Sequence, residues 1–216
     1  MRNTKVGIII FFLSIFLSNS LLYSQTTEIP KFSNKAELLF SNSDFEQGSL
    51  DNWRPFGKAF LNQPTYGDNV FAREAPSSAL PQGSWWIGTY ENYQGLPGQK
   101  AGDAQKNTST GELISQSFTI KKPYLGFLVG GGAKNTTAVR LIINGEVVRE
   151  ASGLNHALMR REFWDVKEFI GNSATISVID KEKGTWGCIN ADDFRGYMMP
   201  DNMLLFPNSD FELGDL

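Results

Sequence analysis

The residues of this chain best suited to chemistry lie in one short segment, SWWIGTYE. Its pattern predicts a strand in which Ile87 faces the core, while Trp86 and Tyr90 face the opposite side. Gly88 lies between these two aromatic residues, and its missing side chain would leave a gap of ~7 Å along the strand. A sugar ring could stack there through its C–H surface, with Glu91 accepting hydrogen bonds from vicinal hydroxyl groups. The segment therefore predicts a surface that contacts carbohydrate.

Three residues elsewhere could complete this surface. Asp68 and Arg73 precede the strand and are expected on a loop, and Trp186 lies in a later segment, WGCIN. In the alternative arrangement, Trp86 packs beneath a loop or against a neighbouring module, and its ring is then unavailable to a ligand.

Other chemistries have weaker support in the sequence. Glu91, Asp68 and Asp180 could serve as general acid and base in glycoside hydrolysis, but no spacing singles out a pair. The one histidine, His156, is expected in a loop, and the one cysteine, Cys188, is expected to be a buried, inert thiol. A single histidine excludes an HExxH zinc site, and a single cysteine excludes an internal disulfide. We therefore expect binding rather than catalysis.

The composition is that of a globular protein that does not bind nucleic acid. The chain has 216 residues, with 20 Lys and Arg against 23 Asp and Glu, a formal net charge of −3. No excess of cations is available to neutralise phosphates. Hydrophobic residues make up 41% of the chain, enough for a packed core.

The N-terminus has the pattern of a secretory signal peptide. Arg2 and Lys5 precede the apolar run VGIIIFFLSIFL, which is too short to cross a bilayer that needs about 20 residues. We expect residues 1–24 to be removed and residues 25–37 to form a flexible leader; the alternative is an uncleaved membrane anchor. Cleavage would give a secreted, periplasmic or cell-surface protein without membrane contact.

An internal repeat indicates tandem modules. Residues 38–50 read LLFSNSDFEQGSL and residues 204–216 read LLFPNSDFELGDL, so ten of thirteen positions match at an offset of 166. That offset is the size of a domain rather than of a solenoid unit. We expect a module at residues 38–199, followed at 200–216 by a linker and the first strand of a second copy in the same chain. The alternative is two similar edge strands of one domain.

The region between the repeats predicts an all-β fold. Strand patterns occur at residues 84–90, 111–120, 124–130, 138–151 and 174–180, and a short helical turn fits at 164–170. Within 138–151, Asn144 and Gly145 favour the type I′ turn of a β-hairpin. Many short strands separated by glycine-rich turns predict a β-sandwich of the jelly-roll kind.

An ordered set of motifs resembles a known family. The segments LLFSNSDFEQGSLDNW, WWIGTYE, TGELISQSFTI, FLVGGG, VRLIINGEVV, FWDVKEFIGNSATISVID and WGCINADDF follow one another over residues 38–196. Together they resemble the galactose-binding-like accessory module that accompanies glycoside hydrolase family 32 enzymes, the levanases and fructan hydrolases. The resemblance implies a carbohydrate-binding-module-like fold and a fructan-type ligand. Cys188 stands where the family is expected to have histidine, and the hydrolase motifs WMNDPNG and RDP are absent from the sequence.

Acidic residues near the two ends of the module suggest a cation site. Glu46 follows Phe45, which would point inward from a strand and leave the carboxylate outside. If the first and last strands pair, Glu46 comes near Asp193, and Ca²⁺ prefers six to eight oxygen ligands of this kind. We expect a structural Ca²⁺ bound by Glu46 and Asp193, which the family resemblance supports; the alternative is that these carboxylates are solvated or pair with Lys and Arg.

Two functions fit these observations. The first is a non-catalytic carbohydrate-binding module of a secreted, multi-module polysaccharide-degrading protein. The second is a structural or adhesive spacer repeated in tandem along a cell-surface protein. Exposed aromatic side chains beside polar groups would distinguish the first from the second.

Overall fold

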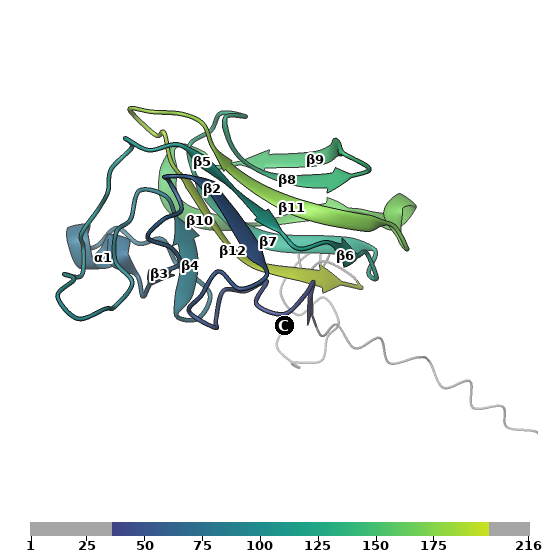
Figure 1. Ribbon diagram of the computed structural model, residues 1–216, viewed down its shortest axis with the longest axis horizontal. Helices are drawn as coiled ribbons and strands as arrows, with labels where there is room; N and C mark the ends of the chain where they lie inside the picture. Colours follow the sequence, from purple (N-terminus) through teal and green to yellow (C-terminus); the bar gives the residue numbers. More distant parts are fainter. Residues whose placement is uncertain (1–35, 199–216) are drawn as a thin grey trace, which may run out of the picture. The chain divides into compact units, whose positions relative to one another are not determined.

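The computed structural model describes residues 36–198, which form two antiparallel sheets packed face to face (Figure 1). In spatial order, the first sheet consists of β10 (His156–Asp165), β7 (Tyr124–Gly131), β12 (Ile189–Tyr197), β4 (Trp85–Gly88) and β3 (Thr65–Tyr66), with β1 (Glu37–Leu38) also paired to β12. The second consists of β2 (Trp53–Gly57), β5 (Gly111–Ser115), β11 (Ser173–Asp180), β8 (Thr137–Ile143) and β9 (Glu146–Ser152), with β6 (Phe118–Thr119) also paired to β11. The predicted β-sandwich is confirmed.

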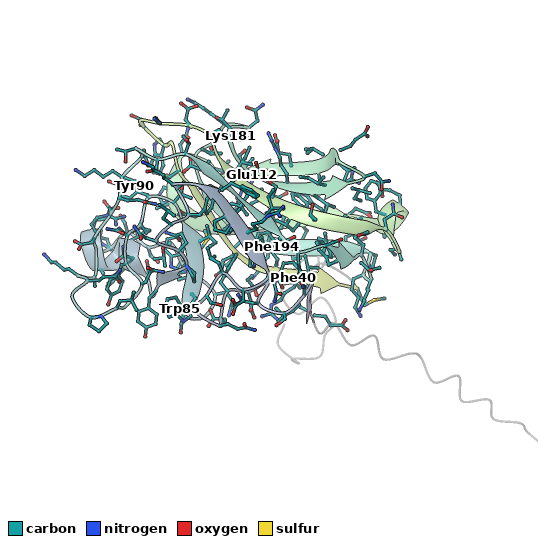
Figure 2. The ribbon with its side chains drawn as sticks, viewed as in Figure 1. Phe40, Trp85, Tyr90, Glu112, Lys181 and Phe194 are labelled. Atoms are coloured by element: carbon teal, nitrogen blue, oxygen red, sulfur yellow. The ribbon has the colours of Figure 1, made fainter. Side chains whose placement is uncertain are left out.

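The core lies between the sheets and follows from the alternation of the strands. In β11, Ile176 and Val178 are both buried in the core, as their spacing of two predicts. Phe194 from β12 stacks on Phe127 from β7 with ring centroids 5.2 Å apart, and Phe40 belongs to the same core (Figure 2). Because the inner face of each sheet is buried in this core, only the outer face of each sheet can contact a ligand.

The predicted hairpin forms at its expected position. β8 and β9 pair in antiparallel register on either side of Asn144 and Gly145, whose φ angles are +52° and +83°. Positive φ at both central residues is the geometry of a type I′ turn.

Several elements differ from the sequence prediction. The predicted helical turn is limited to the 3-10 helix at Lys167–Phe169, and Trp164 belongs to β10. His156, expected in a loop, begins β10. Phe45 is fully buried as expected, but it lies between two turns, with φ of +59°, rather than in a strand.

A helix, α1 (Asn69–Glu74), was not predicted at all. It begins at Asp68, whose carboxylate accepts a hydrogen bond from the Phe71 amide at 3.1 Å and so caps the first turn. A helix of six residues is too short for apolar periodicity to mark it in the sequence.

The ends of the module pair as expected. β1 lies against β12, with Glu37 opposite Gly196 and Leu38 opposite Arg195. β1 thus begins inside the predicted leader. The predictions for the signal peptide at 1–24, for the rest of the leader and for the second repeat copy lie outside the described residues. Within residues 36–198, no helix is long and apolar enough to cross a membrane.

Candidate functional site

A pocket of ≈ 330 Å³ opens on the outer face of the first sheet, at the end where β4 stops and β12 begins. We call it the end pocket. It is lined by Arg73, Glu74, Tyr90, Glu91, Asn107, Ala157, Thr185, Trp186, Cys188 and Asn190. Four of the six residues predicted to contact a sugar are therefore brought together here, namely Arg73, Tyr90, Glu91 and Trp186.

The floor of the pocket is built by β12 and its neighbours. Ile189 faces the core, so Cys188 and Asn190 on either side of it face outward into the pocket. Asn190 lies opposite Gly88 of β4 and Gly130 of β7 in register. Its side-chain amide donates to the Ala157 carbonyl at 2.7 Å, which fixes its orientation.

One wall of the pocket is a buried ion pair. Glu91 is 1% exposed, and its two carboxylate oxygens accept hydrogen bonds from Arg73 Nη1 at 2.6 Å and Nη2 at 3.0 Å. Asn69 Nδ2 donates to the same carboxylate at 2.6 Å. The hydrogen bond to Glu91 raises the pKa of Arg73 above its ordinary value, so the guanidinium stays charged. A bidentate, buried pair of this kind is rigid and can present fixed donors to a ligand.

Helix α1 positions the arginine of this pair. Arg73 lies in the last turn of α1, and Asp68 anchors the helix start. The Asp68 carboxylate also accepts hydrogen bonds from the Ser78 hydroxyl and from the Ala79 amide, the latter at 3.2 Å. Asp68 therefore does not line the pocket, and its predicted contact with a ligand is wrong: its oxygens are occupied in holding α1 and residues 77–79.

Aromatic side chains flank the ion pair. The Arg73 guanidinium lies over the Tyr90 ring at 5.0 Å from its centroid. Trp186 is 36% exposed and adopts φ of +57°, a conformation that is uncommon for a residue with a side chain. The pocket thus combines an accessible indole with fixed polar groups.

The prediction that Trp86 stacks on a ligand is wrong. Its side chain points away from the core, as predicted, but it is 0% exposed because Val70, Ala79 and Met159 cover it. Its indole nitrogen donates to the Gly67 carbonyl at 2.8 Å. The expected gap at Gly88 is also filled, since a Cβ placed there would lie 2.5 Å from the Trp86 ring. Trp86 packs against Val70 of α1 and against Ala79 in the loop that follows. This matches the alternative considered from the sequence, in which Trp86 lies beneath a loop.

Sequence reasoning missed three asparagines of the site. Asn69 holds Glu91, while Asn107 and Asn190 line the pocket. The Asn107 side chain donates to the Gly184 carbonyl at 2.6 Å, but its buried Oδ1 accepts no hydrogen bond from the described residues. A buried acceptor without a partner is costly, so this oxygen has unused hydrogen-bonding capacity. Nothing in the local sequence marks these asparagines, because they come from different loops and strands.

Both acids of the pocket lie beside Arg73. Of its two carboxylates, Glu91 is fully occupied by Arg73 and Asn69, and Glu74 lies 3.8 Å from Arg73. Burial raises the pKa of the Cys188 thiol to about 12, so this side chain stays neutral at physiological pH. The arrangement is suited to binding a neutral polar molecule.

The residues of the predicted calcium site are not arranged as expected. The carboxylate of Asp193 pairs with Arg161 at 2.7 Å and with Arg195, so it is already neutralised. Glu46 accepts hydrogen bonds from the Ser84 and Trp85 amides, each at 2.9 Å. The predicted pairing of Glu46 with Asp193 is wrong, since two arginines hold Asp193.

The neighbouring carboxylate of Asp192 lies in a different environment. Asp192 is 0% exposed, and its Oδ2 accepts from the Gln82 amide at 2.8 Å. Its Oδ1 accepts no hydrogen bond from the described residues. Burial raises the pKa of Asp192 well above its ordinary value, and the negative charges of Asp193 and Glu46 add to this effect. No group of three or more His, Cys, Asp or Glu residues with metal-binding geometry occurs among residues 36–198.

Comparison with known proteins gives one similar curated sequence. No family model matches the chain. The "Putative glycosyl hydrolase ecdE" of Aspergillus rugulosus is 40% identical over 87 residues, which are 40% of this chain and 12% of that protein. This chain therefore matches only a small part of the relative.

Similar solved structures include carbohydrate-binding and adhesin domains. The structure of TmCBM61 in complex with beta-1,4-galactotriose is 17% identical with a TM-score of 0.46, covering 74% of this chain and 97% of that one. The K3 adhesin domain of Lys-gingipain from Porphyromonas gingivalis is 13% identical with a TM-score of 0.39, covering 71% of this chain and 95% of that one.

Proposed function

We propose that residues 36–198 form a non-catalytic carbohydrate-binding module and that the end pocket holds one terminal sugar residue. The observation that carries this proposal is the composition of the pocket wall: an accessible indole at Trp186 beside the fixed Arg73–Glu91 pair. Sugars need an apolar face for their C–H surface and donors and acceptors for their hydroxyl groups, and the pocket supplies both.

The charge of the pocket favours a neutral sugar over an acidic one. Glu91 neutralises Arg73, and the neighbouring Glu74 leaves no net positive charge to attract a carboxylate. The ligand we propose is the end of a fructan or of a similar neutral glycan, as the family resemblance implies. The volume of ≈ 330 Å³ allows one residue of such a chain with bound water, and not a long segment.

We place the module in a secreted, multi-module protein that degrades polysaccharide, of the type associated with glycoside hydrolase family 32. The signal-peptide pattern and the sequence repeat support this setting, as does the partial similarity to ecdE. In that setting the module would hold a catalytic domain near its substrate. Repeated modules would increase the avidity for a polymer, because the second contact is intramolecular.

We also propose a structural Ca²⁺, bound by Glu46 and Asp192 rather than by Asp193. The unpartnered Oδ1 of Asp192 supports this assignment, since this buried oxygen has no donor among the described residues and a cation would give it a partner. Glu46 lies near the beginning of the module's sequence, between β1 and β2, and Asp192 lies in β12, its last strand. A cation at this point would therefore tie the two ends together and stabilise the fold.

Isothermal titration calorimetry of the module with levan, inulin, fructose and a panel of other glycans tests the sugar proposal. Trp186→Ala should abolish binding while leaving the melting temperature unchanged, because the side chain is accessible and contributes little to the core. Phe71→Ala is the matched control: this ring is 53% exposed on α1 and does not line the pocket. If the wild-type module binds none of these glycans, the proposal is wrong and the spacer function is favoured.

A further inference from the structure

A second hollow, of ≈ 300 Å³, lies at the end of the second sheet, where β2 stops and β5 begins. It is lined by Phe56, Gly57, Thr110, Gly111, Glu112 and Lys181. We call it the edge hollow. Trp53 of β2 and Leu113 of β5 face the core, so Phe56 and Glu112, which lie opposite each other in register, both face outward. Figure 2 shows Glu112 and Lys181 at this end of the second sheet.

The edge hollow exposes an aromatic ring. Phe56 is 44% exposed on the outer edge strand of its sheet. The Arg54 guanidinium lies 4.9 Å from the ring centroid and covers part of one face. A large exposed ring in an edge strand adds nothing to the core, and a ligand with an apolar face can stack against it.

Polar groups with both donors and acceptors surround this ring. Lys181 lies 3.9 Å from the Glu112 carboxylate, a distance at which the pair is loose and the ammonium keeps free donors. The other oxygen of Glu112 accepts a hydrogen bond from the Ser177 hydroxyl at 2.6 Å, which holds the carboxylate in place. The hydroxyl group of Thr110 completes a set that can bind sugar hydroxyl groups.

The edge hollow and the end pocket share two loops. Asn107 lines the pocket and Thr110 lines the hollow; two residues separate them, so their Cα atoms lie at most ~11 Å apart. On the second loop, Lys181 lines the hollow and Thr185 the pocket, at most ~14 Å apart. The Asn107 side chain joins the two loops through its hydrogen bond to the Gly184 carbonyl at 2.6 Å. The two sites are thus neighbours across one ridge.

We propose that the edge hollow is a second subsite, which contacts the further residues of a neutral oligosaccharide whose terminal residue occupies the end pocket. This inference rests on the proposed function. A ligand that leaves the end pocket over the ridge formed by residues 107–110 and 181–185 meets the Phe56 ring next. The module then selects an oligosaccharide over the single sugar.

Calorimetry with fructose and with inulin-type oligosaccharides of two to five residues tests this inference. For the wild-type module, we expect the affinity to rise with chain length. Phe56→Ala should lower the affinity for the longest oligosaccharide by about 5- to 10-fold, the effect of losing one aromatic contact. The same variant should bind fructose as well as the wild type does.

Two controls make the result decisive. Lys181→Gln removes the charge and shortens the side chain, and it should also weaken the binding of only the longer ligands. Phe71→Ala, which touches neither site, should bind all ligands normally; a change in melting temperature identifies any variant that fails to fold. If affinity does not depend on chain length, or Phe56→Ala leaves the length dependence intact, the second subsite is wrong and the end pocket stands. If the wild type binds neither fructose nor any oligosaccharide, both proposals fail.

Discussion

Replacing Asp180 by Asn should stabilise the module, and the gain should grow as the pH rises. Asp180 ends β11, is 1% exposed and faces inward, since Val178 two residues earlier belongs to the core. Its Oδ1 accepts no hydrogen bond from the described residues. Burial raises the pKa of this carboxyl from 3.8 to about 6, although a hydrogen bond from Thr89 opposes the effect.

The sign and size of the effect follow from this pKa. The folded state holds the proton up to about pH 6, whereas the unfolded chain releases it near 3.8, so the stability of the folded state falls as the pH rises through this window. Relative to a pH below both pKa values, the raised pKa of Asp180 lowers the free energy of unfolding by about 1 kcal/mol at pH 4.5 and by about 3 kcal/mol at pH 8. An amide of the same shape never ionises and avoids this cost.

Urea unfolding of the wild type and of Asp180→Asn at pH 4.5, 6 and 8 measures the difference. The variant should gain about 2 kcal/mol more at pH 8 than at pH 4.5, with an unchanged m-value. Asp165→Asn is the control: the pKa of this exposed carboxyl lies below its ordinary value because the Lys167 amide and ammonium donate to it, so any pH trend should be small and opposite. A gain for Asp180→Asn that is equal at all three pH values would refute the reasoning.

Three further predictions concern the ion pair, the cation and the hairpin. Arg73→Ala leaves Glu91 buried without its counter-ion and should cost about 3–5 kcal/mol in urea unfolding; a loss below 1 kcal/mol would show that the carboxylate relaxes into solvent. Chelator should lower the melting temperature of the wild type but not of Asp192→Asn or Glu46→Gln, and identical wild-type melts with and without chelator would exclude the calcium site. Gly145→Ala places a side chain at φ of +83° and should cost about 1 kcal/mol of stability, whereas no loss would mean that the turn changes type.

Several strands, and the side on which their residues lie, could be read from the sequence, whereas β2, β3 and β10 were not predicted. Ile176 and Val178 repeat with a period of two and are both in the core, and Asn144–Gly145 forms the predicted turn. The period also placed Ile87 inside and Trp86 outside. These properties depend on neighbouring residues of one segment, because successive side chains of a strand must point to opposite faces.

The sequence did not show which outward residues remain accessible. Trp86 is covered because Asp68 fixes α1 and residues 77–79 above it, and this arrangement requires contacts between separate segments. Strand alternation gives the side of the sheet on which a ring lies, and it gives no information about what packs over that ring. The same limit hid the pocket contributions of Asn107 and Asn190.

The tertiary structure also determined which of the adjacent residues Asp192 and Asp193 pairs with arginine. β12 has an irregular register after Asp192, and Asp193 adopts φ of +54° there. This irregularity turns Asp193 toward Arg161 and Arg195 and leaves Asp192 buried with an unpartnered oxygen. The sequence determined that acidic residues lie near the beginning and the end of the module's sequence. The pairing of the first and last strands brings these two segments together. Only the bulge decided which carboxylate is neutralised, because it redirects the side chains relative to the regular alternation from which the prediction was made.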